Sequence, residues 1–273
     1  MMFFRVVKAE MEKIIKQQFF TARTLFWTLA LPLGNGLYLY FFYLPFAAKS
    51  VNLGFPNGPV FTLDLVGFTL TGQLLYSFFT MMLLAGNTFV REREQGTLEA
   101  VLLAPANRTA ILFGGAVAGA LNYIWLLIGV LFSWVVFLNT GVFVNDVMAL
   151  TASISLSFLS LVALGMCFEA FFFHSRRGVM YATMMQEPVE FLSGLIFPLN
   201  KMPLMLLSLS YLLPLTFGLV AVRLTLLGGA TMTDVAVPLA VLAFMIAVFS
   251  LLAIWLIGYA ERSAKKKATL TEF

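Results

Sequence analysis

The sequence predicts an all-α integral membrane protein with six transmembrane helices. Hydrophobic residues make up 61% of its 273 residues and charged residues only 11%, whereas an ordinary soluble domain is about one quarter charged. A charge at the centre of a bilayer costs roughly 2.5 to 3.5 kcal/mol on insertion scales, so charged residues should lie mainly between the spans. The basic residues do gather in short segments beside apolar runs, where they set membrane orientation and give no sign of nucleic-acid binding.

Residues 1–23 predict an amphipathic helix in the membrane interface. Apolar residues such as Phe4, Val7 and Met11 recur at helical spacing, and charged residues fill the other face. Acidic and basic residues alternate here, and no apolar core follows within the first twenty residues, so we do not expect a cleaved signal peptide. The same pattern allows a second interpretation, a cytosolic helix packed on protein.

Six long apolar runs predict the transmembrane helices, because each can cross about 30 Å of hydrocarbon at about 1.5 Å per residue. The runs lie at about 25–47, 64–90, 111–138, 147–173, 179–198 and 236–259. We expect one domain over 1–273, in which the N-terminal helix is followed by a six-span bundle over 24–260 and a cytoplasmic tail over 261–273.

A seventh apolar stretch, 203–222, is long enough to span but contains Pro203 and Pro214. With six spans, both termini face the cytoplasm with 14 of the 17 basic residues, whereas seven spans would export the basic tail against the positive-inside bias. We therefore expect 198–222 to form a re-entrant or interfacial helical hairpin on the outer side, shielded by protein where its backbone is broken. The outside loops then hold only three basic residues, Lys49, Lys201 and Arg223.

A short charged segment, REREQGTLEAVLLAP at 91–105, connects the second and third predicted spans. Thr97 can cap a helix, Glu99 lies in its first turn where the helix dipole favours an acid, and Pro105 ends it. The sequence thus predicts a helix at about 98–104 that lies across the cytoplasmic surface of the membrane. Its apolar side has no obvious core on this chain, which favours a cytoplasmic partner. A positive-inside loop with an incidental helix is the alternative.

The charged segment resembles the E-R-E-x-G-T-L-E-x-L-L-x-x-P motif of ABC-2 type transporter permeases. A second stretch, 191–223, is similar to the region between the fifth and sixth spans of that family, with spaced prolines and an S-G-x-x-F-P start. In the family, the first segment couples the spans to a separate ATP-hydrolysing subunit by docking in a cleft of that subunit. The residues to which the resemblance gives this coupling role are Arg91, Glu92, Arg93, Glu94, Gly96, Thr97, Leu98 and Glu99.

The resemblance implies a transport subunit without enzymatic activity of its own. The sequence has no G-x-x-x-x-G-K-[ST] motif, which is the phosphate-binding loop needed for ATP hydrolysis. We therefore expect no cofactor on this chain, with ATP and Mg bound by a separate ABC ATPase subunit. The resemblance also implies a second permease copy, with a homodimer favoured over a heterodimer, and export across a plasma membrane (bacterial or archaeal inner). Lipids, drugs, polysaccharides, peptides and ions all remain open as substrates.

Polar residues share one face of the second predicted span and one face of the fifth. Intramembrane polar and ionisable residues usually face a bundle interior or a watery cavity, and the resemblance puts both spans near the subunit interface. We therefore expect these faces to line a substrate path. The path residues are Thr69, Gln73, Tyr76 and Thr80 on the second span and Gln186, Glu187 and Glu190 on the fifth.

Two alternatives for these polar residues remain open. In the first, Gln73, Glu187 and Glu190 satisfy one another, or the backbone beside Pro188, in a structural role. In the second, the two acids bind the coupling ion of a gradient-driven secondary carrier. With a single histidine, His174, and a single cysteine in an apolar run, the sequence offers no metal site, disulfide or nucleophile-and-base pair.

Overall fold

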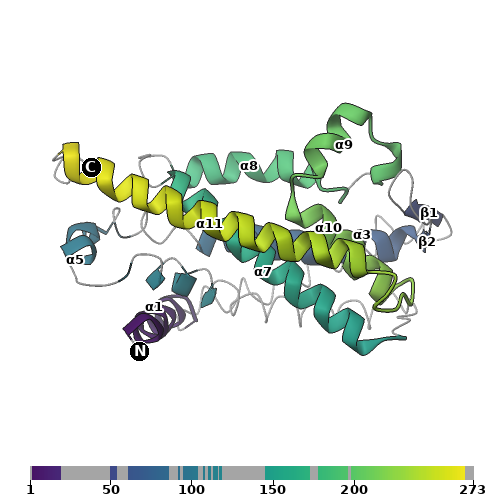
Figure 1. The fold of residues 1–273 in the computed structure, drawn as a ribbon, viewed down its shortest axis with the longest axis horizontal. Helices are drawn as coiled ribbons and strands as arrows, with labels where there is room; N and C mark the ends of the chain where they lie inside the picture. The colour runs from purple at the N-terminus through teal and green to yellow at the C-terminus, as the bar shows by residue number, and fades with distance from the viewer. Residues whose placement is uncertain are drawn as a thin grey trace.

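Two long apolar helices, α7 (Val147–Phe172) and α11 (Ala236–Lys267), lie side by side along the long axis of the computed structural model (Figure 1). Their segments Val147–Phe171 and Ala236–Tyr259 are long and apolar enough to cross a membrane. They coincide with the predicted fourth and sixth spans.

The structure describes most of the predicted elements, but not all of them. The described residues are 2–19, 50–53, 61–85, 92, 95–103, 107, 110–111, 113–115, 117–118, 145–172, 178–195 and 198–267. The first predicted span, 25–47, lies outside these residues, as does most of the third, 111–138.

Helix α10 (Pro214–Leu226) is the buried centre of the bundle, packed against α3, α7 and α11. A proline suits its first turn, where a backbone N–H would lack a helical partner in any case. The 3-10 turn η2 (Leu199–Lys201) and helix α9 (Leu204–Ser210) precede it, and α9 meets α10 at 88°. We call α9 and α10 the bent pair.

The bent pair falls in the region of the predicted helical hairpin, 198–222, and continues to Leu226. Its geometry fits a broken span or a re-entrant loop, so the described residues contain two helices able to cross a membrane, or three if the pair counts as one span. The bend is held by the Thr216 hydroxyl, which donates to the Ser210 carbonyl at 2.8 Å. One expectation is corrected here: Arg223 does not lie in an outside loop but inside α10, with only 2% of its surface exposed.

Two further helices complete the described bundle, α3 (Leu65–Ala85) and α8 (Gly178–Leu192). They correspond to the predicted second and fifth spans, and both contact α7. The core between α3, α7 and α10 is apolar and well filled, as expected where side chains of three helices interdigitate. Its most deeply buried members include Phe79, Leu161, Leu215 and Leu219.

A short antiparallel hairpin of β1 (Ser50–Leu53) and β2 (Phe61–Asp64) leads directly into α3. Its register pairs Ser50 with Asp64 and Leu53 with Phe61. This hairpin departs from the predicted all-α fold; it lies between two apolar runs that dominate the sequence pattern. The glycine- and proline-rich sequence between the strands is typical of a hairpin connection.

Helices α1 (Met2–Phe19) and α5 (Leu98–Leu103) lie at the end of the molecule where α11 finishes, and the β-hairpin lies at the opposite end (Figure 1). Helix α1 buries Val7 and Ile14 and exposes Phe4 and its charged face, so it has the amphipathic character that the sequence predicts. Helix α5 begins where predicted.

Candidate functional site

The described part of the predicted coupling segment is Glu92 together with residues 95–103. The Thr97 N–H donates to the Glu92 carbonyl at 2.9 Å, and the Thr97 carbonyl accepts from the Val101 N–H at 3.1 Å, so the chain turns directly into α5. Gly96 supplies the left-handed backbone that this turn needs, with φ of 71°. Thr97 therefore begins the helix as predicted, although its hydroxyl bonds backwards, to Glu92.

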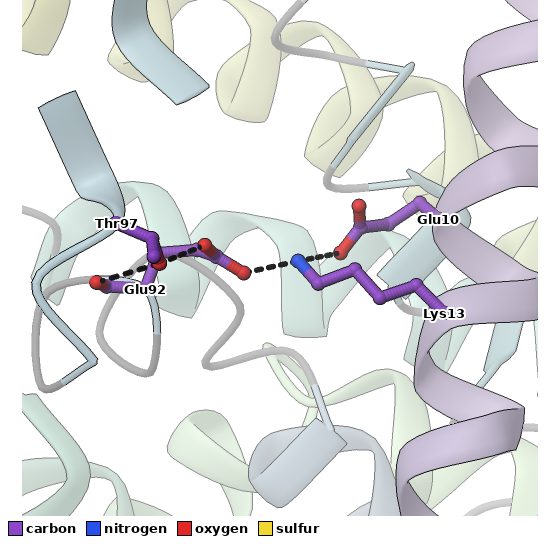
Figure 2. A network of polar contacts seen from close by, with 4 residues as sticks. All are labelled: Glu10, Lys13, Glu92 and Thr97. Atoms are coloured by element: carbon purple, nitrogen blue, oxygen red, sulfur yellow. Dashed lines mark hydrogen bonds and ion pairs between the residues drawn. The ribbon is translucent and has the colours of Figure 1, made fainter. Parts of the chain in front are cut away.

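The side chain of Glu92 points inward and is 7% exposed. One of its oxygens accepts from the Thr97 hydroxyl at 2.5 Å, and the other forms an ion pair with the Lys13 ammonium of α1 (Figure 2). Lys13 also pairs with Glu10 at 3.4 Å, so one lysine joins two acids from separate segments (Figure 2). The predicted coupling residue Glu92 is thus a link between α1 and the turn before α5.

The neighbouring carboxylates of Glu10 and Glu92 stabilise the positive charge of Lys13. Burial alone would lower the pKa of the ammonium, but the hydrogen bond from Lys13 to Glu92 and the charges of Glu10 and Glu92 raise that pKa above its ordinary value. Lys13 therefore stays protonated at neutral pH, and the two carboxylates keep a cation between them.

The remaining described residues of the segment face two ways. Gln95, Gly96, Thr97 and Ala100 are exposed, and the Leu103 side chain is 83% exposed. Val101 is half-buried and packs against the main core, so α5 does have a core contact on its own chain, contrary to expectation. The other predicted coupling positions, Arg91, Arg93 and Glu94 and the side chains of Leu98 and Glu99, lie outside the described part.

The polar faces of α3 and α8 meet at one point. The Tyr76 hydroxyl of α3 donates to the Glu190 carboxylate of α8, and the Glu187 carboxylate lies within electrostatic range of both. Glu187 itself is exposed on α8. The structure therefore brings together Tyr76 and Glu190, one residue from each of the two predicted polar faces.

Two other predicted path residues, Gln73 and Thr80, form hydrogen bonds within α3. The Gln73 amide donates to Ser77 at 3.5 Å rather than to an acid of α8, and the Thr80 hydroxyl donates to the Ser77 carbonyl at 2.9 Å. Thr69 is half-buried on α3. The Gln186 side-chain nitrogen is buried without a hydrogen-bond partner among the described residues.

Sequence reasoning missed two polar features of the molecule. One is the ion pair between Lys13 and Glu92, and the other is the buried, hydrogen-bonded side chain of Arg223. Lys13 and Glu92 are 79 residues apart, so no local pattern joins them. No cluster of three or more metal-binding side chains occurs in the part of the chain that the structure describes.

Residues 47–255 match the family of ABC-2 family transporter proteins. The match includes α3, α5, the helices from α7 to α10 and most of α11. The chain belongs to the ABC-2 transporter family. A search of curated proteins found no match. As an ABC-2 permease the chain is a membrane transport component that is not itself catalytic, and such permeases in general work with a partner ATPase subunit.

Proposed function

We propose that this permease is the membrane subunit of an ATP-driven exporter, and that α5 passes the movement of a separate ATPase subunit to the bundle through α1. The observation that carries this proposal is the two-sided character of the coupling segment. Its outer side offers the exposed Leu103, and its inner side is tied to the protein by Val101 and by Glu92.

The two sides have different mechanical roles in this proposal. An ATPase that docks on the exposed side can push α5 as a unit, because the turn at Gly96 and Thr97 is hydrogen-bonded to Glu92. The ion pair from Glu92 to Lys13 then carries the displacement into α1. Since the membrane interface constrains an amphipathic helix along its length, movement of α1 displaces the spans beside it.

The transport path in this proposal runs along the polar faces of α3 and α8. Glu187 is exposed on a helix that corresponds to a predicted span, and an exposed carboxylate inside a membrane needs water or protein around it. A second permease copy facing α8 supplies both, with the path between the two copies. Short connections and apolar spans favour an amphiphilic substrate. The family match gives no support to a gradient-driven carrier.

The first test is capture of the tagged full-length chain from its native membrane, with mass spectrometry of what co-purifies. We expect a stoichiometric ATP-binding-cassette subunit with the wild-type chain and its loss with Leu103→Glu, because a charge enters the exposed apolar contact. Phe4→Glu is the matched control, since Phe4 is 76% exposed at the same end of the molecule but lies on α1.

Two outcomes contradict the proposal. The first is the absence of any ATPase under conditions that preserve other membrane complexes. The second is equal loss of the ATPase in Leu103→Glu and Phe4→Glu, because the docking surface would then not be α5.

A further inference from the structure

Arg223 has the largest fully buried side chain among the described residues. It lies in the last turn of α10 and is 2% exposed. A buried guanidinium is costly unless its donors are satisfied, so its surroundings must compensate for the lost water. The contacts of Arg223 therefore show how the lost water is replaced.

The contacts of Arg223 join three elements at one point. On α3, its Nε donates to the Thr71 hydroxyl at 3.2 Å and its Nη2 donates to the Phe68 carbonyl at 2.9 Å. Beyond the end of α8, its Nη1 donates to the Gly194 carbonyl at 2.9 Å and its Nη2 contacts the Leu195 carbonyl at 3.4 Å. The guanidinium carbon also lies 3.7 Å from the centroid of the Phe68 ring, within range of a cation–π interaction.

The partners of Arg223 are dipoles rather than a counter-charge. In the part of the chain that the structure describes, no carboxylate forms an ion pair with it. Two of these partners, the carbonyls of Gly194 and Leu195, follow the last turn of α8, so the negative end of the α8 dipole lies near the guanidinium. Gly194, with φ of 81°, turns the chain there and presents its carbonyl to the guanidinium.

The space for this guanidinium depends on Gly72 of α3. A Cβ at position 72 would lie 2.9 Å from Nη2 of Arg223 and 3.1 Å from Cγ of Leu195. A Cβ at Gly67 on the same helix would meet only the flexible side chain of Leu227, at 3.1 Å. Gly72→Ala would therefore displace the guanidinium, whereas Gly67→Ala would alter α3 without reaching the guanidinium.

We propose that Arg223 is a clamp that locks the bent pair to α3 and to the end of α8. Release of the Gly194 and Leu195 carbonyls frees residues 193–195, where α8 gives way to the segment leading into α9. The clamp fixes the conformation of the molecule at this point, and any movement of α8 against α10 in a transport cycle must break it. This inference does not need the proposed ATPase partner, so the two can fail separately.

Hydrogen–deuterium exchange of the full-length protein in lipid nanodiscs tests the clamp. We expect exchange in peptides covering 189–195 to rise on the order of tenfold in Gly72→Ala and Arg223→Met, as after loss of a hydrogen bond to a charged group. Arg223→Lys should give an intermediate rise, because an ammonium keeps the charge but cannot reproduce the planar fork. Peptides covering 239–250 of α11 should stay within twofold of wild type, on the order of the usual effect of a distant change.

Gly67→Ala is the matched control and should leave exchange at 189–195 unchanged. Gly72→Ala keeps the test decisive if Arg223→Met does not insert, because it displaces the guanidinium without removing it. Unchanged exchange at 189–195 in Gly72→Ala would overturn the inference. A uniform rise across all helices, or an equal rise in Gly67→Ala, would also overturn it, since either would indicate general destabilisation.

Discussion

The ion pair between Lys13 and Glu92 gives a direct prediction for α1. Lys13→Met removes the cation beside the Glu92 carboxylate, whose side chain is only 7% exposed. We therefore expect the free energy of unfolding to fall by about 1 to 3 kcal/mol. This is less than for a fully buried pair, because the Lys13 side chain retains 34% of its exposure. Thermal unfolding of the purified full-length chain measures the change.

Lys8→Met is the matched control for Lys13→Met. It removes the same charge from the same helix, but Lys8 meets Glu12 at 3.9 Å in an exposed pair, so its loss should cost under about 0.5 kcal/mol. Adding Glu92→Gln to Lys13→Met should restore part of the loss, since the remaining side chain is then neutral. Equal effects of the two lysine substitutions would contradict the role of Glu92 as a link between α1 and the turn before α5.

Individual residues show where sequence reasoning succeeds and where it stops. Thr97 and Gly96 were predictable, because capping and left-handed turns depend on neighbours in the chain. The contact between Tyr76 and Glu190 was predictable as well. Helical spacing places each on a polar face, and polar residues inside a membrane usually pair with one another or face the bundle interior. Arg223 was not predictable, because three of its four acceptors are backbone carbonyls, which no side-chain pattern reveals.

The start of α7 is joined to the connection between α10 and α11 through Asp146. One of its oxygens caps α7 by accepting from the backbone of Met148 and Ala149, and the other accepts from the Met232 N–H at 3.1 Å. The hydrogen bond from the backbone of Ala149, followed by those from Met232 and Met148, holds the pKa of Asp146 below its ordinary value. A single carboxylate therefore joins the start of α7 to the connection that leads into α11.

This arrangement predicts a pH dependence for that connection. Because the folded-state pKa of Asp146 is lowered, its stabilising effect is present above the unfolded pKa, about 3.9, and is lost as pH falls through the folded value. We expect amide exchange at 228–236, corrected for intrinsic rates, to rise below about pH 4 in the wild type. In Asp146→Asn that exchange should be raised already at neutral pH and depend less on pH. An unchanged pH profile in Asp146→Asn would contradict this role.

The helices differ in how far their sequences determine them. The boundaries of α7 and the start of α11 follow from uninterrupted apolar runs, and they agree with the prediction to within a residue. The bent pair needed the additional argument from basic residues, because its length alone fits a span. The buried position of α10 in the bundle could not be predicted, because helices in the core of a membrane protein and helices that face lipid are both apolar.

The molecule as a whole has two distinct ends. Helices α1 and α5 lie at the end where α11 finishes, and the β-hairpin lies at the other (Figure 1). The proposed docking surface at α5 and the clamp at Arg223 in α10 thus belong to separate elements. Demonstrating that a signal passes from α5 to the bent pair requires coupling between variants at the two sites.

The exposed residues of α8 lead us to predict that two copies of the chain meet across this helix. If two copies meet across α8, a two-fold axis brings some residues of this helix close to their own counterparts. Glu187→Cys should then form a disulfide between copies in native membranes under mild oxidation. The native thiol of Cys167 should not interfere, because it is buried and bonded to the Phe249 carbonyl at 2.9 Å.

Phe244→Cys is the control for this assembly, because Phe244 is 69% exposed on α11, on a face suited to lipid. Cross-linking at 187 but not at 244 would support a homodimer across α8 and explain how an exposed carboxylate persists on a membrane helix. Cross-linking at 244 but not at 187 would contradict that arrangement, and would move the subunit interface to α11. Glu187 would then have to face water within a single copy, because lipid cannot solvate its charge.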